Sequence, residues 1–219
     1  MFLTTDNQIK WKKMTVAAVV TAVLVFLGIV WFDKPLFSAI RGFNCGLWNL
    51  FDKVFSAKVW LSVSLVAAIV LCIKKYVKSD LNLRTTVRDS FEKTKTSHAF
   101  LILYSILSAG IIVKILKTFI GRARPIFFEA LDMTGFFPPS TDWAFNSMPS
   151  GHTAVTFAGL VMIGMLAPRY KVLTWSLAIL VAFSRIAIGA HWPSDVIFGA
   201  FIGMVIADII KWQMMKKAK

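Results

Sequence analysis

Long apolar runs alternate with short polar or basic segments along the whole chain. The apolar runs cover residues 15–32, 59–73, 99–120, 153–167, 172–189 and 196–212. The first run contains no charged residue, and a membrane-spanning helix needs roughly 20 mostly apolar residues. The pattern therefore predicts six transmembrane helices. In the last run Gly199 and Gly203 are four residues apart, a spacing that favours close packing of one helix against another.

The beginning of the chain allows two interpretations. A basic start at residues 10–13 followed by an apolar run is typical of a retained first helix and also of a secretory signal peptide. Residues 33–40 contain no small-x-small cleavage pattern. We therefore expect the first helix to be retained in the membrane.

Two segments between the runs have different character. In residues 35–58 apolar side chains recur at helical intervals between polar ones, which predicts an amphipathic helix lying in the membrane interface. Residues 74–96 are rich in lysine and arginine and predict a solvated basic loop. The chain shows no internal repeat and no stretch typical of a soluble domain. We expect a single all-α membrane domain over residues 1–219.

The composition agrees with a membrane protein. Of the 219 residues, 57% are hydrophobic and 16% are charged, and the mean hydropathy is +0.68. Soluble domains are about 45–50% apolar. The formal net charge of +14 is also typical of nucleic-acid-binding proteins, but here the cations flank the apolar runs, as they do in membrane proteins that are oriented by charge. We therefore expect no nucleic-acid partner.

The distribution of the cations predicts the orientation in the membrane. Most of the 25 lysines and arginines fall in the N-terminal segment, in residues 74–96, in the turn at residues 169–171 and in the C-terminal tail. Because cytoplasmic segments carry the excess of Lys and Arg, we expect both termini on the cytoplasmic side of the inner membrane. The end of the third run, the start of the fourth and the junction of the fifth and sixth then meet at the external, periplasmic face.

Lys117 and Arg124 form the first of three polar groups at that face. They are seven residues apart, which on a helix places them on nearly the same side. Pro125 disfavours helical geometry at Arg124, so the helix should end there and leave the guanidinium free to face a ligand. Two cations that reach for the lipid headgroups explain the pair about equally well, and for Lys114 and Arg122 we prefer that explanation.

The second group is the sequence Pro149-Ser150-Gly151-His152 at the start of the fourth run. The free N–H groups and the positive dipole end of such a helix favour the binding of an anion. A plainer explanation is that Ser150 only caps the helix and that His152 is a surface histidine. Ser150 fits both roles.

The third group lies at the junction of the last two runs. His191 and Asp195 are four residues apart, and an aspartate that accepts from one ring nitrogen leaves the other nitrogen with a nucleophilic lone pair. Pro193 suits the first position of a helix, so Asp195 would lie in the first turn, where the dipole alone favours a carboxylate. Arg185 lies near the outer end of a membrane helix, where a bound phosphate would compensate its charge.

Taken together, the three groups resemble the three-part signature of the type 2 phosphatidic acid phosphatase superfamily. The matching residues are Lys117-x6-Arg124-Pro125, Pro149-Ser150-Gly151-His152 and Ser184-Arg185-x5-His191-x3-Asp195. Every defining position of the signature is present, and the layout of six spans with an interfacial segment after the first also matches, so the resemblance covers most of the chain. Residues 126–148 match no single subfamily.

The resemblance implies roles for eight residues of the signature. His191 would attack phosphorus and form a phosphohistidine, Asp195 would orient it, and His152 would protonate the leaving group. The phosphoryl oxygens would be held by Lys117, Arg124, Ser150, Gly151 and Arg185. Because fixed cations and a helix N-terminus supply the charge stabilisation that phosphoryl transfer needs, we expect neither a metal ion nor another cofactor.

The implied function is metal-independent hydrolysis of a lipid phosphate or pyrophosphate at the external leaflet. Undecaprenyl pyrophosphate ranks first as substrate, followed closely by phosphatidylglycerophosphate, phosphatidic acid and lipid A phosphate. One alternative is a lipid phosphotransferase, in which a lipid hydroxyl intercepts the phosphohistidine. Another is a transporter of anionic lipids, because charges inside a membrane also mark transport pathways, although the chain lacks the paired discontinuous helices expected of transporters.

Overall fold

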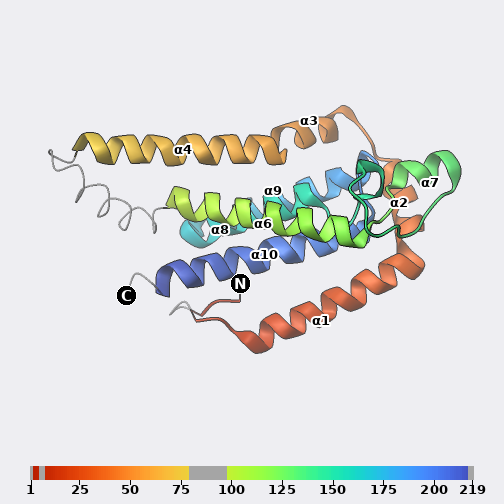
Figure 1. Cartoon of the computed structure of the whole chain (residues 1–219), viewed down its shortest axis with the longest axis horizontal. Helices are drawn as coiled ribbons and strands as arrows, with labels where there is room; N and C mark the ends of the chain where they lie inside the picture. The colour runs from red at the N-terminus through yellow and green to blue at the C-terminus, as the bar shows by residue number, and fades with distance from the viewer. Residues whose placement is uncertain (1, 5–7, 79–97, 217–219) are drawn as a thin grey trace.

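The computed structural model describes residues 2–4, 8–78 and 98–216, and these residues are almost entirely helical (Figure 1). The long helices are α1 (Trp11–Leu27), α4 (Ala57–Lys78), α6 (His98–Ile120), α8 (Gly151–Leu166), α9 (Lys171–Ala187) and α10 (Pro193–Lys216). The shorter ones are α2 (Asp33–Arg41), α3 (Gly46–Val54) and α7 (Pro125–Leu131), with single-turn helices at Trp143–Phe145 and Pro168–Tyr170. The predicted all-α fold is confirmed.

Five helical segments in the described part of the chain are long and apolar enough to cross a membrane. They are Trp11–Arg41, Gly46–Val70, His98–Ile120, Pro168–Ala187 and Pro193–Met215. The remaining predicted span, residues 153–167, coincides with α8, whose 16 residues form a helix about 24 Å long. This is less than the roughly 30 Å of a typical hydrocarbon core. Six full-length spans are therefore not confirmed.

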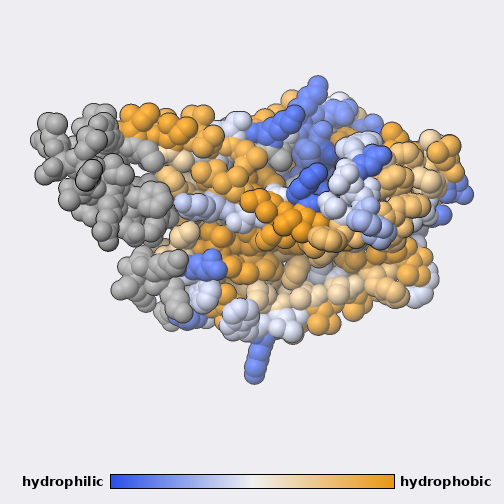
Figure 2. All heavy atoms as spheres, in the orientation of Figure 1, coloured by the Kyte–Doolittle hydropathy of each residue, from blue (hydrophilic) through white to orange (hydrophobic). Residues whose placement is uncertain are grey.

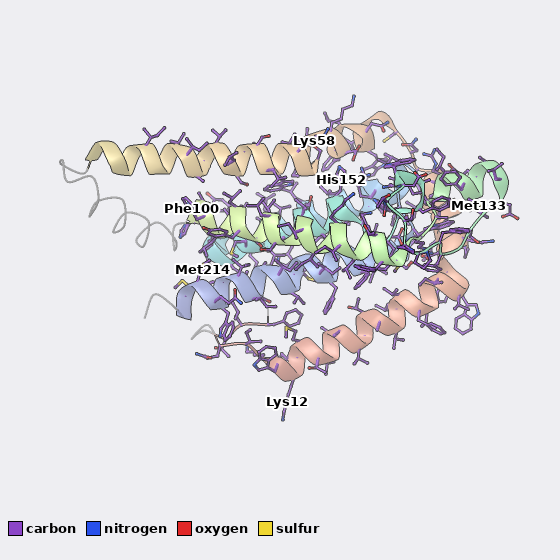
Figure 3. The ribbon with its side chains drawn as sticks, viewed as in Figure 1. Lys12, Lys58, Phe100, Met133, His152 and Met214 are labelled. Atoms are coloured by element: carbon purple, nitrogen blue, oxygen red, sulfur yellow. The ribbon has the colours of Figure 1, made fainter. Side chains whose placement is uncertain are left out.

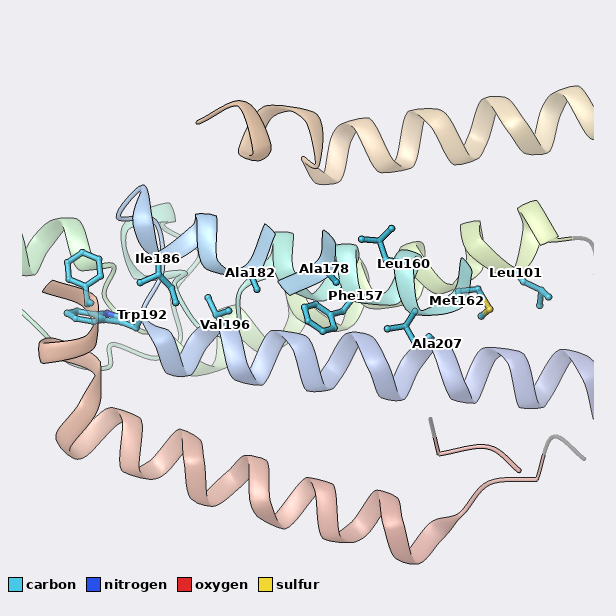
Figure 4. Packing of buried hydrophobic residues seen from close by; sticks show 12 residues of the cluster. Leu101, Phe157, Leu160, Met162, Ala178, Ala182, Ile186, Trp192, Val196 and Ala207 are labelled. Atoms are coloured by element: carbon cyan, nitrogen blue, oxygen red, sulfur yellow. The ribbon is translucent and has the colours of Figure 1, made fainter. Parts of the chain in front are cut away.

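Helix α8 is short but central. It packs against α6, α9 and α10, and most of its residues are buried. Figure 4 shows the apolar core along these helices, with Phe157 and Leu160 of α8 among side chains from α9 and α10. The close helix packing predicted at Gly199 and Gly203 of α10 is against α8. A Cβ atom at Gly203 would lie only 2.8 Å from Cβ of Phe157. The two helix backbones meet there with no room for a side chain.

Helices α1 and α4 lie on opposite sides of this central bundle (Figure 1). The first packs against α10 and the second against α6. Both carry exposed apolar side chains, among them Val16 and Phe26 on α1 and Val63 and Val66 on α4. Figure 2 shows apolar residues across the middle of the molecule. In a membrane such faces contact lipid tails, which are as apolar as leucine side chains.

Residues 35–58 are largely helical, as predicted, but they form parts of two short helices rather than one. Helix α2 continues from α1 through a π-helical turn (Gly28–Phe32), and α3 begins only at Gly46. Gly42 follows α2 directly, and glycine is a poor helix former. The interruption lets Phe37 of α2 pack against Trp192, with ring centroids 5.2 Å apart, while α3 packs against α9.

The predicted basic loop is only partly described. Helix α4 extends through the first residues of the 74–96 segment to Lys78. Residues 79–97 lie outside the described part of the chain.

The C-terminal end of α6, the N-terminal end of α8 and the α9–α10 junction meet at one end of the bundle, beside α2, α3 and α7 (Figure 1). The start of α1 and the end of α10 lie toward the other end. Hydrophilic residues gather near α3 and near the loops around α7 (Figure 2). The fold thus brings the three polar groups of the sequence to the same end of the molecule.

Candidate active site

The α9–α10 junction positions His191 through a tight turn. Helix α9 ends at Ala187, and Gly189 follows with a φ of +80°, a left-handed conformation that glycine adopts without strain. The backbone N–H groups of Ala190 and His191 both donate to the carbonyl of Arg185, at 3.0 and 3.2 Å. Pro193 then starts α10, as predicted. The turn holds the His191 imidazole in the interior, where the residue is 2% exposed.

Asp195 lies in the first turn of α10, as predicted, and is fully buried. Its Oδ2 accepts hydrogen bonds from the Ser147 hydroxyl at 2.5 Å and from the Trp192 backbone N–H at 3.0 Å. The Nδ1 atom of His191 is 3.7 Å from the same oxygen and 3.5 Å from Oγ of Ser147. Nδ1 of the ring therefore faces a carboxylate and a hydroxyl together, rather than the carboxylate alone.

The other carboxylate oxygen of Asp195 binds Arg122. Nη1 of Arg122 is 2.6 Å from Oδ1 of Asp195, and Nη2 is 2.6 Å from Oδ2 of Asp33 at the start of α2. Asp33 also accepts from the N–H and hydroxyl groups of Ser194, at 2.9 and 2.5 Å, which caps α10. The interpretation of Arg122 as a headgroup-facing cation is wrong, because it is 6% exposed. Burial would lower the pKa of Arg122, but the two carboxylates outweigh burial and raise it.

Lys117 and Arg124 come together, but not because they share a helix face. Helix α6 ends at Ile120, four residues before Arg124, and Gly121 reverses the chain with a φ of +61°. Nζ of Lys117 donates to the carbonyl of Asn146, and Nη2 of Arg124 donates to the same oxygen at 3.3 Å. Both cations thus hold the loop that leads into α8. Lys114, the other proposed edge cation, is exposed.

Arg124 is held in place by several further contacts. Its Nε donates to the carbonyl of Trp143 at 2.9 Å, its Nη1 donates to that of Ala190 at 3.0 Å, and the guanidinium stacks 4.3 Å from the Trp143 ring centroid. Burial lowers the pKa of Arg124 to about 10, so the side chain still carries its charge at neutral pH. The contact with Ala190 places this charge beside His191.

Ser150 precedes α8 and links it to α10. It occupies the N-cap position with extended backbone angles, yet its side chain makes no capping hydrogen bond. Its hydroxyl lies 2.9 Å from Oγ1 of Thr153, and its N–H donates to the backbone carbonyl of Asp195 at 2.9 Å. A Cβ atom at Gly151 would lie 3.7 Å from Cε of Lys117. The free N-terminal end of α8 therefore lies beside Lys117 and Asp195.

His152 and Arg185 meet at a residue of α3. Nε2 of His152 is 3.5 Å from Oδ1 of Asp52, and Arg185 forms an ion pair with the same carboxylate. The His152 side chain is 30% exposed, and Figure 3 shows this residue between the α3 segment and the body of the bundle. The Arg185 side chain is 6% exposed, and its Nε has no hydrogen-bond partner.

The electrostatic environment keeps His191 neutral. Burial lowers the pKa of His191 well below its usual range, the Lys117, Arg124 and Arg185 charges lower it further, and the nearby Asp195 carboxylate opposes these effects. The positive charges of Lys117 and Arg124 are felt at the His152 ring as well as at the His191 ring, so both histidines share one cationic environment. A neutral imidazole whose Nδ1 carries the proton has its lone pair on Nε2, and three cations act electrostatically on this ring. This is a suitable arrangement for attack on an anionic phosphorus centre.

Sequence reasoning missed four residues of this site. They are Asp33, Asp52, Arg122 and Ser147. Arg122 has no sequence feature that distinguishes it from a cation at the membrane edge, and Ser147 stands alone in an irregular loop. Asp33 follows an apolar run and so resembles an ordinary helix boundary. The described residues contain no group of three or more His, Cys, Asp and Glu side chains that could hold a metal ion.

Comparisons with known proteins identify the family of this chain. A model described as the PAP2 superfamily matches residues 98–219. A lipid A 1-phosphatase of Rhizobium johnstonii is 38% identical over 112 residues, which cover 49% of this chain and 46% of the relative. The chain thus spans about half the length of that relative. An undecaprenyl-diphosphatase of Sulfolobus acidocaldarius is 25% identical over 171 residues, 76% of each protein.

A solved structure shares the fold. The crystal structure of a transmembrane PAP2 type phosphatidylglycerolphosphate phosphatase from Bacillus subtilis matches 94% of this chain and 98% of its own, with a TM-score of 0.62 and 19% identity. The region matched by the family model begins at α6 and includes all three polar groups, whereas Asp33 and Asp52 lie before it. Because that region is more than half of the sequence, the chain belongs to the PAP2 superfamily.

Proposed function

We propose that the protein is a membrane lipid phosphatase in which His191 takes the phosphoryl group from a lipid and passes it to water. The observation that carries the proposal is the buried His191 ring, whose Nδ1 faces Asp195 and Ser147 and on which the charges of Lys117, Arg124 and Arg185 act. Such a ring presents a neutral Nε2 to a phosphate drawn in by the cations. Phosphoryl transfer depends mainly on positioning and charge stabilisation of this kind.

In the first step, the Nε2 lone pair of His191 attacks phosphorus. The P–N bond forms, the P–O bond to the lipid breaks, and protonated His152 gives its proton to the leaving oxygen. In the second step, water attacks the phosphohistidine while neutral His152 accepts its proton, and the P–N bond breaks. Inorganic phosphate leaves, and both histidines return to their starting states.

The cations and the α8 N-terminus bind the phosphoryl oxygens in this mechanism. Lys117, Arg124 and Arg185 offset the charge of the oxygens, and the N–H groups near Ser150 and Gly151 donate to them. No step requires a metal ion. Activity should therefore survive excess EDTA, and a loss that Mg²⁺ restores would contradict the mechanism.

Lipid A 1-phosphate is the substrate that we rank first. The support is the 38% identity to a protein named lipid A 1-phosphatase. Undecaprenyl pyrophosphate comes second, supported by a match of lower identity over 76% of a protein named undecaprenyl-diphosphatase. This order reverses the one favoured by the sequence. The site would face the external side of the inner membrane, with both termini in the cytoplasm, as the distribution of cations predicts.

The test is phosphate release by the purified protein in detergent. Lipid A 1-phosphate, undecaprenyl pyrophosphate, phosphatidylglycerophosphate and phosphatidic acid serve as substrates. We expect release from at least one lipid and a loss of kcat by several orders of magnitude in His191→Ala. His98→Ala is the matched control, because His98 is exposed at the start of α6. Retention of most activity in His191→Ala would reject the nucleophile, and phosphorylated lipid in place of free phosphate would indicate a phosphotransferase.

A further inference from the structure

Asp52 of α3 binds Arg185, a side chain that binds the substrate phosphate in the proposed function. Its carboxylate forms an ion pair with Arg185 and lies 3.5 Å from Nε2 of His152. We propose that Asp52 is an internal competitor of the substrate, and that a phosphate reaches Arg185 and His152 only by displacing this carboxylate. The inference rests on the proposed function, because it takes Arg185 and His152 as phosphate-facing groups.

Packing of α3 brings Asp52 to this position. Helix α3 contacts α9, and the Trp48 ring lies 5.0 Å from that of Phe183 on α9. Asp52 is one helical turn after Trp48, so its side chain projects from the same side of α3. The Asp52 side chain is 31% exposed, whereas that of Arg185 is 6% exposed. The carboxylate therefore reaches the buried guanidinium from the solvent side.

The chemistry of the pair favours exchange for a phosphate. A guanidinium offers a planar fork of donors that matches carboxylate and phosphate oxygens equally well. Nε of Arg185 is buried and has no hydrogen-bond partner, so Asp52 does not satisfy the whole fork. A phosphate brings more acceptor oxygens and more negative charge. The two anions repel each other when they share one cation, so binding of the phosphate disfavours the Asp52 contact.

The connections of α3 permit such a displacement. Residues 42–45 and 55–56, on either side of the helix, are not helical. The Asp52 side chain can therefore turn away from Arg185 while Trp48 of the same helix keeps its contact with Phe183 on α9. Release of Asp52 thus accompanies substrate binding, and the site selects ligands with enough negative charge to compete.

The decisive variant is Asp52→Asn, which keeps the shape of the side chain and removes its charge. We expect it to lower the inhibition constant of inorganic phosphate and the KM of the lipid about fivefold, the range of a partly exposed ion pair. Asp132→Asn is the matched control, because Asp132 is an exposed acid with a weak ion pair to Lys34, and its removal changes the net charge equally. The control should leave the inhibition constant unchanged.

A double-mutant cycle separates competition at Arg185 from a general field effect. In an Arg185→Gln background the gain from Asp52→Asn should disappear, because the contested cation is gone. Persistence of the gain would overturn competition at Arg185. An unchanged or higher inhibition constant in Asp52→Asn would also overturn the proposal, and a higher one would instead make Asp52 an orienting partner of Arg185.

A second readout does not depend on turnover. Inorganic phosphate should raise the Tm of Asp52→Asn in detergent more than it raises that of the wild-type protein, because a ligand stabilises the state that it binds. The unliganded Tm of each variant reports whether it folds. Failure of every lipid substrate would reject the proposed function, whereas an equal phosphate-induced shift in both proteins would reject the role of Asp52.

Discussion

Arg122 and Asp195, 73 residues apart in the sequence, form a buried ion pair with Nη1 2.6 Å from Oδ1. The pair fixes one oxygen of the carboxylate whose other oxygen lies beside His191. Through its second nitrogen, Arg122 also holds Asp33 at the start of α2. The first membrane helix is thereby coupled to the candidate catalytic residues, although it contributes none of them.

Replacement of Arg122 should therefore destabilise the fold. In Arg122→Gln two buried carboxylates lose their shared cation, and breaking a buried ion pair costs about 3–5 kcal/mol. Thermal unfolding in detergent measures the change, and Arg169→Gln, at an exposed arginine, is the control. Equal Tm values for the two variants would show that the network contributes nothing to stability.

Removal of the Ser147 hydroxyl should weaken catalysis without harming the fold. In Ser147→Ala the Asp195 carboxylate loses the hydrogen bond from the hydroxyl but keeps those from Arg122 and Trp192, and Nδ1 of His191 loses its hydroxyl contact. Because a hydrogen bond to a charged group contributes about 1.5–3 kcal/mol, we expect kcat to fall roughly 10- to 100-fold while KM changes little.

Ser184→Ala is the matched control for this change. Ser184 is equally buried, but its hydroxyl donates to Val181 in its own helix. A loss of kcat of the same size in both variants would remove the specific role of Ser147.

The pH dependence of kcat/KM should depend on the charge at Arg124. Neutral His191 is the reactive form. An ordinary imidazole has a pKa of about 6.5, and because the pKa of His191 is lowered, His191 becomes protonated only at more acidic pH. Removing a neighbouring positive charge makes the imidazolium less unfavourable, so Arg124→Gln should raise the pKa of His191 and move the acid limb to higher pH. Titration of the substrate affects the wild-type protein and Arg124→Gln equally. The difference between their pH profiles therefore reports ionisation of protein groups. An unshifted limb would mean that Arg124 does not act on His191.

A methyl group at Gly199 should force α10 away from α8. The added Cβ would lie 2.5 Å from the Ser150 carbonyl oxygen, and overpacking of this kind costs about 1–3 kcal/mol. At Gly110 in α6 a Cβ meets no atom within 4 Å, so Gly110→Ala should be neutral or slightly stabilising. Thermal unfolding of the two variants provides the comparison, and a Gly199→Ala protein as stable as Gly110→Ala would contradict the packing argument.

Hydrophobic periodicity and local spacing determined much of this protein in advance. Apolar runs located the six long helices, because a membrane helix must satisfy its backbone internally along an apolar stretch. Pro193 located the start of α10, and Asp195 then falls in its first turn. Both the preference of proline for the first helical position and that of carboxylates for the first turn are local. Successive spans cross the membrane in alternating directions, and this alternation predicts that the three polar groups lie at the same end of the bundle.

Only the tertiary structure decided how the site is held together. Lys117 and Arg124 meet at Asn146 through the turn at Gly121, where the sequence suggested a shared helix face. The Arg122 network and the Asp52 contact join residues from separate helices. Such contacts depend on how helices pack, and packing is set by the sum of many side-chain contacts. The spacing of residues along one helix carries no information about partners on another.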